Sequence, residues 1–491
     1  MECDVLIVKP ADQKNVYGGL DAFSLTAYEP PLWTALLAGH IRGAGYSVKL
    51  LDVEVEKLSA EEAAKRIIEL DPRLTVISVS GTNPSASTQN MLALRKIVNK
   101  CRELEHTHKY IAAQGIHVSA LPERTLAEEK LDFVCCGEGF YTITPLVEAI
   151  KRSAVSAEEL RNIPGLCFRT QDKPVKTEAA PLYKNLDELP MAAWDLLPME
   201  KYRAHNWHCF GDIDHRQPYG LIWTALGCPF HCHFCCINTM FNSRPGIRFR
   251  SPKKVLEEID YLVNTYGIHN FKIADELFAM KEQRVAEICQ GLIERNYHLN
   301  IWTYGRVDTV TPAMLEIMKK AGINWIAYGF ESGNKTVLEE VSKGYDFNTV
   351  DTVVKMTYGA GMHIAANFMF GLPKDNYDSM QQTLQMAFDI NAEWANFNSV
   401  MAYPGSGLYG DAVKSGSRLP ETWQGYSQYA ADCLPMDTEY LSAEEVVAFR
   451  DYAFKAYFTN PRYLKRMENI FGLETVEVIK EMTSRPLRRN N

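Results

Sequence analysis

The sequence lacks several features that would place the protein in a common class. Its 491 residues contain no apolar run close to the roughly 20 residues that a helix needs to cross a bilayer. Its N-terminus reads as a strand, not as a secretory signal peptide. The formal net charge of −9 disfavours a nucleic-acid scaffold, which would present a basic face. We therefore expect a cytoplasmic protein that binds neither membranes nor nucleic acid.

The cysteines form neither a disulfide framework nor a set of paired zinc ligands. The chain has 12 of them, but no secretory signal and no regular pairing. Structural zinc sites use four ligands and favour two CxxC pairs, and no second pair is present. The cysteines are therefore expected to be free thiols, some of which hold a metal centre.

One group of cysteines is compact. Cys228, Cys232 and Cys235 have the spacing CxxxCxxC and directly follow an apolar, strand-like segment at residues 221–226. Three thiolates on one loop can hold three irons of a 4Fe–4S cluster and leave the fourth iron open to a small molecule. Zinc is the weaker alternative because a fourth ligand is missing. We interpret the adjacent Cys236 as a packing residue.

This loop resembles that of the radical S-adenosylmethionine (radical SAM) enzymes, in which the open iron binds SAM. Phe234, one residue before the third cysteine, stands where that family holds the adenine. The resemblance implies that one electron from the cluster cleaves SAM to a 5′-deoxyadenosyl radical, which takes hydrogen from an unactivated carbon. It also implies an electron donor such as flavodoxin or ferredoxin.

Six strand–helix units follow from residue 220 and predict a partial (β/α)6 barrel over residues 216–410. The strands are expected at residues 220–226, 271–274, 300–304, 325–329, 364–369 and 394–400. Barrel chemistry lies at the carboxyl ends of the strands, where several polar residues occur. The resemblance implies that Asp275 and Glu276 bind the SAM amino group and that Arg306 binds its carboxylate. It also implies that Glu331, Ser332 and Gly371 contact the ribose and the adenine of SAM.

Residues 1–151 predict a separate doubly wound parallel sheet, so that the fold class is α/β. The strands are expected at residues 5–8, 47–51, 74–80, 110–113 and 133–136. Such sheets bind ligands beyond the carboxyl ends of their strands. No GxGxxG motif follows the first strand, which disfavours a dinucleotide.

The loops at those strand ends resemble the cobalamin-binding (B12-binding, Rossmann-like) domain that precedes many radical SAM domains. The residues in these loops that would contact cobalamin are Thr82, Asn83, Ser85, Gly115, His117, Val118, Gly137, Glu138 and Gly139. The motif Asp-x-His-x-x-Gly, which supplies an axial histidine in other cobalamin proteins, is absent because Gly115 stands in its Asp position. Cobalamin would therefore bind base-off without a histidine from the protein, with Asn83 facing its lower side. The alternative is a domain that binds nothing.

The remaining segments connect and cover these two units. Residues 152–215 are rich in proline and predict a linker. Residues 411–491 predict a small helical C-terminal cap, with a helix opened by Ser442, that either covers the barrel mouth or simply closes the barrel.

The resemblance implies a cobalamin-dependent radical SAM C-methyltransferase that acts on a small molecule or a peptide. Two alternatives remain: a radical SAM enzyme of this architecture that catalyses a cyclisation, oxidation or rearrangement, and a corrinoid or metal carrier without turnover. A tRNA methylthiotransferase is disfavoured because the first domain lacks three cluster cysteines and the tail is not a basic RNA-binding barrel.

Overall fold

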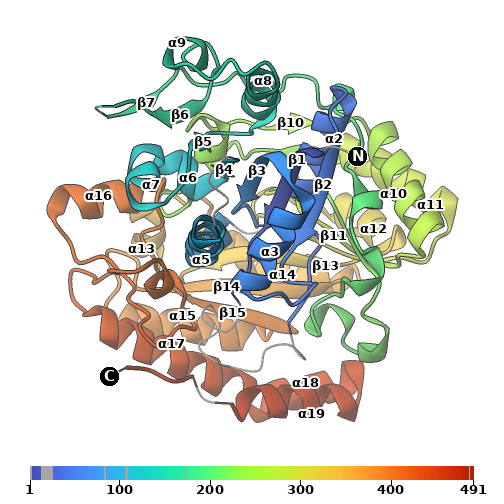
Figure 1. Cartoon of the computed structure of the whole chain (residues 1–491). Coiled ribbons are helices and arrows are strands. Elements are labelled where there is room, and N and C mark those ends of the chain that lie inside the picture. The colour runs from blue at the N-terminus through green and yellow to red at the C-terminus, as the bar shows by residue number, and fades with distance from the viewer. Residues whose placement is uncertain are drawn as a thin grey trace.

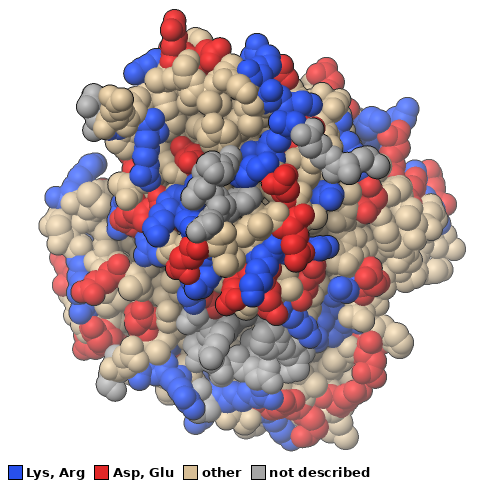
Figure 2. Space-filling model, viewed as in Figure 1, with Lys and Arg blue, Asp and Glu red and all other residues tan. Residues whose placement is uncertain are grey.

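The computed structural model describes residues 3–12, 26–81, 84–104, 109–171, 173–485 and 487–490. Two α/β units lie against each other, and the last helices run along the lower edge of the molecule in Figure 1. None of the helices in these ranges combines the length and the apolar character required to cross a bilayer. On the face drawn in Figure 2, acidic and basic side chains are intermixed.

The first unit is a seven-stranded sheet in the order β2-β1-β3-β4-β5-β6-β7. Its first five strands are parallel, which confirms the predicted doubly wound sheet. They are β1 (Cys3–Lys9), β2 (Val48–Asp52), β3 (Pro72–Ser78), β4 (Tyr110–Gln114) and β5 (Phe133–Cys135). These strands are rich in consecutive apolar residues because helices bury both faces of the sheet.

Helices cover both faces of this sheet. Val5 and Ile7 of β1 belong to one apolar core, whereas Leu6 and Val8 belong to another. The first core includes side chains of α2 (Leu32–Gly43) and α8 (Phe140–Lys151); the second includes those of α3 (Ala60–Leu70) and α5 (Met91–Glu103). Three short helices lie at or near the strand ends: α4 (Pro84–Gln89), α6 (Ile116–Ala120) and α7 (Pro122–Glu128).

The sheet extends beyond the predicted domain end at residue 151. After α9 (Ala157–Leu160), the strands β6 (Leu166–Arg169) and β7 (Pro174–Lys176) add an antiparallel hairpin to β5. The rest of the predicted linker contains short 3-10 turns at η2 (Leu186–Glu188), η3 (Trp194–Leu196), η4 (Met199–Lys201), η5 (Trp207–Cys209) and η6 (Ile213–His215). The hairpin was not predicted because both strands are very short and one begins with proline.

The second unit contains six parallel strands in the order β15-β14-β13-β12-β11-β8, as the six strand–helix units predict. They are β8 (Tyr219–Ile222), β11 (Asn270–Ile273), β12 (Asn300–Gly305), β13 (Ile323–Glu331), β14 (His363–Phe370) and β15 (Trp394–Ser399). The predicted strand 220–226 is interrupted, since β9 (Ala225–Leu226) pairs with β10 (Arg248–Phe249) instead.

The helices of this unit follow their strands in the usual βα order (Figure 1). They are α10 (Pro252–Tyr266), α11 (Glu282–Arg295), α12 (Pro312–Lys320), α13 (Lys335–Glu340), α14 (Val350–Gly359), preceded by η8 (Phe347–Thr349), and α15 (Tyr377–Ile390). Ser251 caps α10 through a hydrogen bond to the backbone N–H of Lys254, and Pro252 fits its first turn.

The C-terminal segment comprises α16 (Gly407–Ser415), η9 (Trp423–Tyr426), α17 (Ala443–Phe458), α18 (Pro461–Phe471) and α19 (Leu473–Thr483). Ser442 and Glu445 form the capping box that begins α17, as predicted. Arg450 Nε of this helix donates to the Phe397 carbonyl of β15 at 2.8 Å. The helix α17 therefore closes the barrel at its last strand, which matches the second interpretation of this segment.

Candidate active site

The three predicted cluster ligands lie on the loop between β9 and η7 (Ile237–Phe241). A backbone hydrogen bond fixes the start of this loop, because the Gly246 N–H donates to the Cys228 carbonyl at 2.9 Å. Gly227 has a φ of +94°, and a side chain there would collide with the Gly246 carbonyl. Cys235 N–H donates to the Cys232 carbonyl at 3.0 Å and tightens the turn between those two ligands.

A second contact fixes the loop from the side. His233 Nε2 lies 2.6 Å from Asp411 Oδ2 on α16, and the His233 N–H donates to the Val341 carbonyl at 3.0 Å. Gly407 faces the His233 ring so closely that no side chain would fit between them. These contacts position the loop between Cys232 and Cys235 without using either thiol.

The donor set fits an iron–sulfur cluster. Burial raises the pKa of Cys228 to about 11 and that of Cys235 well above its usual range. Within the described ranges, no group of three His, Cys, Asp or Glu side chains is arranged to bind a single metal ion. Three cysteines on one short loop without a fourth ligand match the needs of a multi-iron cluster better than those of zinc.

Arg306 extends from the end of β12 to the cysteine loop. Its Nη1 lies 4.0 Å from Cys232 Sγ, and its guanidinium carbon lies 3.8 Å from the centre of the Phe230 ring. Nε and Nη2 each donate to the Asp308 carboxylate at 2.9 Å. The Arg306 guanidinium group, which was predicted to bind the SAM carboxylate, is therefore partly occupied by Asp308.

A buried ion pair stands beside Phe234. Lys343 Nζ lies 2.6 Å from Glu331 Oε1, and both side chains are less than one-tenth exposed. The ammonium group lies 5.8 Å from the Phe234 ring centre, and the Lys343 carbonyl accepts from Arg306 Nη2 at 2.8 Å. Glu331 has a φ of +62°, a strained conformation for a residue with a side chain.

The position of Lys343 beside Phe234 of the cysteine loop was not predicted from the sequence. A side chain at Gly329 would collide with both Glu331 and Lys343, so the pair depends on this glycine. The lysine comes from the segment after α13, and only the fold brings it to the strand end. The run Gly-Phe-Glu-Ser-Gly at 329–333 was the available signal for a buried carboxylate that needs a cation.

The adjacent carboxylates Asp275 and Glu276 have different surroundings. Asp275 is buried and accepts hydrogen bonds from Thr224 N–H at 2.6 Å, from Ala225 N–H at 3.0 Å and from the Thr224 hydroxyl. It thus anchors the backbone that leads into the cysteine loop. Burial, with a smaller contribution from Asp275, raises the pKa of Glu276 to about 8. No described group donates a hydrogen bond to the Glu276 carboxyl, so a cationic ligand group could pair with it once its proton is lost.

Ser332 and Gly371 support turns at the barrel rim. The Ser332 hydroxyl is fully buried, lies 3.2 Å from the Thr383 hydroxyl and accepts from Asn334 N–H at 3.1 Å. Gly371 has a φ of +88° and lies against Val446 of α17. Their predicted contacts with SAM stay predictions.

In the first domain, the predicted cobalamin residues of the loop after β4 are packed into the protein. Gly115 has a φ of +142° and lies so close to Val79 that a Cβ would not fit. His117 is 1% exposed, and its Nδ1 lies 3.1 Å from the Thr88 hydroxyl. Its ring meets Trp423 edge-on with 4.3 Å between centres. Val118 belongs to the second apolar core, which also contains Leu6 and Val8 of β1.

The loop after β5 joins the two domains. Glu138 is 3% exposed; its carboxylate lies 2.6 Å from Arg248 of β10 and accepts from Tyr183 N–H at 2.8 Å. The Gly137 carbonyl accepts from Gln114 at 3.0 Å, and Gly139 begins α8 with a φ of +87°. Glu138 therefore holds the first domain against the barrel.

Ser85 lies at the same edge of the first sheet and hydrogen-bonds to the Tyr403 hydroxyl, which comes from the end of the barrel. Thr82 and Asn83 lie outside the described residues, so their predicted contacts with cobalamin stay predictions.

A small cavity of about 20 Å³ lies between the two domains. On the first-domain side it is lined by Trp33, Ser80, Gly81 and Ile116. On the barrel side it is lined by Trp223, Leu226, Gly227, Ile237, Met240, Phe241 and Glu276. The carboxyl ends of both sheets therefore face one shared space, and the carboxyl group of Glu276 lies in it.

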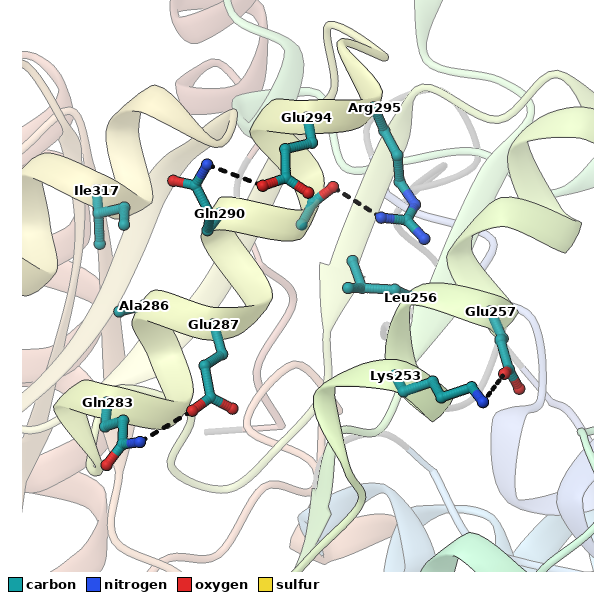
Figure 3. Close-up of a pocket in the computed structure, with 11 residues that line it drawn as sticks. Lys253, Leu256, Glu257, Gln283, Ala286, Glu287, Gln290, Glu294, Arg295 and Ile317 are labelled. Atoms are coloured by element: carbon teal, nitrogen blue, oxygen red, sulfur yellow. Dashed lines mark hydrogen bonds and ion pairs between the residues drawn. The ribbon is translucent and has the colours of Figure 1, made fainter.

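A larger groove lies on the outside of the barrel between α10, α11 and α12 (Figure 3). Its volume is about 870 Å³, and it is open to solvent. The side chains that line it bond to each other along their own helices, as Gln283 does to Glu287 and Gln290 to Glu294. None of the cysteine-loop residues or strand-end carboxylates described above lies in this groove, so we place the site at the shared cavity.

A three-cysteine loop at the carboxyl edge of a six-stranded parallel barrel defines the class of radical SAM enzymes. The model of the radical SAM superfamily matches residues 224–387, and the model of the B12 binding domain matches residues 21–147. The chain belongs to the radical SAM enzymes that carry an N-terminal B12-binding domain, as the sequence predicted.

Several curated proteins are similar over most of the chain. An uncharacterized methyltransferase, PH0819 of Pyrococcus horikoshii, is 27% identical over 89% of this chain and 89% of its own. The cytidylyl-2-hydroxyethylphosphonate methyltransferase of Streptomyces wedmorensis is 24% identical over 80% of this chain and 79% of its own. The anaerobic magnesium-protoporphyrin IX monomethyl ester cyclase of Cereibacter sphaeroides is 27% identical over 77% of this chain and 60% of its own.

Two solved structures share the complete fold. The radical SAM methyltransferase TsrM from Kitasatospora setae, with cobalamin and a 4Fe–4S cluster bound, has a TM-score of 0.69 at 16% identity over 94% of this chain and 90% of its own. The cobalamin-dependent radical SAM enzyme OxsB has a TM-score of 0.72 at 16% identity over 98% of this chain and 72% of its own. At these identities the likeness establishes the arrangement of the domains.

Proposed function

We propose that the protein is a cobalamin-dependent radical SAM C-methyltransferase that works in the cytoplasm on a small molecule or a peptide. The observation that carries the proposal is the cavity shared by the two domains. Gly81 and Ile116, from the loops after β3 and β4, line it together with Gly227 and Glu276 of the barrel, which lie next to the cysteine loop and at a strand end. The three cysteines and the described cobalamin candidates lie in the same or adjacent loops but not in the lining itself. Methyl transfer between two cofactors requires this juxtaposition.

The residues around the cysteine loop supply complementary groups for SAM. The carboxyl group of Glu276, once its proton is lost, is suited to the ammonium of the methionine moiety. Lys343, and the part of the Arg306 fork that Asp308 leaves open, are suited to its carboxylate. Phe234 offers an aromatic face to the adenine. When bound, the cluster and SAM supply the radical that activates a substrate carbon, and cobalamin supplies the methyl group.

Base-off cobalamin without a protein histidine is part of the proposal. His117, the only histidine among the predicted cobalamin contacts, faces Thr88 and Trp423. Burial lowers its pKa to about 3, so it stays neutral in the folded protein. A ring held in this way is unavailable as an axial ligand unless the Trp423 contact is broken.

The test is anaerobic reconstitution with iron, sulfide and hydroxocobalamin, followed by reaction with SAM that carries a deuterated methyl group. Candidate substrates are examined by mass spectrometry for a product that contains the labelled methyl group, together with 5′-deoxyadenosine. Formation of 5′-deoxyadenosine with a product that never contains the label would contradict methylation.

A second candidate is a cyclisation, oxidation or rearrangement without methylation. It is favoured by the similarity to the cyclase of Cereibacter sphaeroides. The same experiment distinguishes the two, because a cyclisation consumes SAM for its radical and leaves the deuterated methyl group on methionine.

A further inference from the structure

A short run of positive charge interrupts this acidic chain. Residues 244–254 read Arg-Pro-Gly-Ile-Arg-Phe-Arg-Ser-Pro-Lys-Lys and contain no Asp or Glu, although the whole chain has a net charge of −9. We call the cations of this run, together with the neighbouring Lys281, the basic strip. Its members are Arg244, Arg248, Arg250, Lys253, Lys254 and Lys281.

The basic strip is attached directly to the cysteine loop. Within it, β10 pairs with β9, the strand that leads into the three cysteines. The Gly246 N–H donates to the Cys228 carbonyl at 2.9 Å, and residues 243–246 are exposed. A single backbone hydrogen bond therefore connects the molecular surface to one of the proposed cluster ligands.

The cations of the strip divide into two groups. Arg248 and Arg250 are paired with the buried carboxylates of Glu138 and Glu258, at 2.6 and 2.5 Å. Their charge is largely neutralised within the fold. The other members face solvent.

Three of the solvent-facing cations stand out. Arg244 is exposed and forms no ion pair with a described residue. The Lys253 side chain is 83% exposed and lies only at 3.9 Å from Glu257. Lys281 is exposed and lies 4.4 Å from the centre of the Phe249 ring, which keeps it beside β10. Exposed cations thus lie within the turn next to Cys228, beside β10 and at the start of α10.

We propose that the basic strip is the docking surface for an acidic one-electron carrier protein. This inference rests on the proposed function, because a cluster that cleaves SAM reductively takes up one electron for each cleavage. The carrier is oxidised by one electron and the cluster is reduced by one, and no covalent bond forms or breaks in the transfer. The electron enters through the turn at Gly246 and its hydrogen bond to Cys228.

Charge explains why this surface fits such a partner. Two acidic proteins repel each other at long range, so productive encounter requires a local patch of opposite sign. The groove in Figure 3 begins beside Lys253 but is lined further along by Glu257, Glu287 and Glu294. Its acidic walls disfavour the same partner, which limits the docking surface to the strip.

The test uses the reconstituted holoenzyme and an acidic flavodoxin as the probe. In one arm, oxidised flavodoxin is coupled to the enzyme with a carbodiimide, which joins carboxylates to lysines in contact. We expect the cross-links at Lys253, Lys254 and Lys281. Cross-links confined to other lysines would overturn the proposal. Protection of the basic strip from modification by a single-stranded RNA, but not by flavodoxin, would also overturn it.

In the second arm, reduced flavodoxin is mixed with the enzyme at low ionic strength, and reduction of the cluster is followed by stopped-flow absorbance. The variant Arg244→Glu/Lys253→Glu is expected to slow this reduction about tenfold or more. The control Lys355→Glu/Lys480→Glu makes the same change of charge at two solvent-exposed lysines on α14 and α19 and should react at the parent rate. Equal rates in the strip variant and the control would overturn the proposal.

Dithionite separates this inference from the proposed function. It is a small reductant that needs no docking surface, so all the variants should be reduced by it, and cleave SAM, at the parent rate. Failure of the parent to make 5′-deoxyadenosine with dithionite would contradict the proposed function. The cross-linking arm would still decide whether the strip binds the carrier.

Discussion

The loops of the barrel and those of the first domain meet at one cavity, but their side chains are used differently. At the barrel rim, the Glu276 carboxyl lies in the cavity without a described hydrogen-bond donor, and Lys343 stands beside Phe234 in a pair with Glu331. In the first domain, His117 and Glu138 are already bonded to Thr88 and Arg248. A cluster and SAM need side-chain ligands, whereas the first domain can contact its ligand mainly through backbone and small residues. Substitutions in the two regions test this contrast, beginning with the one that should change the protein most.

The largest effect is expected at the cysteine loop. Cys228→Ala should reduce iron content and lower 5′-deoxyadenosine formation to the level of protein without iron, because a cluster with only two protein ligands is not retained. Cys236→Ala is the matched control: it removes a neighbouring buried thiol and should keep both iron and activity. Iron content and product are measured anaerobically. Equal loss in the two variants would show that the loop merely collapses.

Lys343→Met should weaken SAM binding about 10- to 100-fold while the cluster spectrum stays unchanged. The substitution removes a buried charge-assisted contact and keeps an unbranched side chain only one atom shorter. Lys335→Met, on the exposed side of α13, is the control. Titration of the reconstituted protein with SAM by calorimetry gives the affinity. An unchanged affinity would restrict Lys343 to pairing with Glu331.

Glu138→Gln should affect stability more than cobalamin binding. The change leaves Arg248 without its buried partner, which typically costs about 3 kcal/mol or more of unfolding free energy. Thermal unfolding of the cobalamin-free protein should show this loss. The free energy of hydroxocobalamin binding should change by less than the free energy of unfolding. A large loss of cobalamin affinity with unchanged stability would make Glu138 a direct ligand and weaken the contrast between the two regions.

His117 should produce the smallest effect, visible only on acidification. Its folded pKa of about 3 lies below the ordinary value of 6.5, so the unfolded chain binds the proton more readily. Stability must then fall as the pH is lowered from 6.5 towards 3. Between pH 7.5 and 5.5 this histidine accounts for about 1.4 kcal/mol.

The variant His117→Asn should therefore lose about 1.4 kcal/mol less stability than the parent over that interval. Denaturant unfolding at both pH values measures the difference. Identical pH dependence in parent and variant would mean that His117 is not enclosed by Trp423 as described.

The barrel could be predicted, and the cluster ligands proposed, because their signals are local. The alternation of strands and helices and the spacing of Cys228, Cys232 and Cys235 are each contained in short segments. Lys343 was missed because its partner Glu331 belongs to another element and no pattern links them. The contact of Trp423 with His117 was not predicted, because it joins the C-terminal segment to the first domain. The role of Glu138 was equally hidden, since Arg248 belongs to the other domain.

The central claim is that the two domains present their cofactors to one shared space. It is tested most directly by electron paramagnetic resonance of the anaerobically reconstituted protein that holds both cobalamin and a reduced cluster. The account predicts magnetic coupling between the paramagnetic cobalt and the cluster, seen as broadened or split signals relative to samples with either cofactor alone. Two independent, unperturbed signals in a fully loaded sample would contradict it.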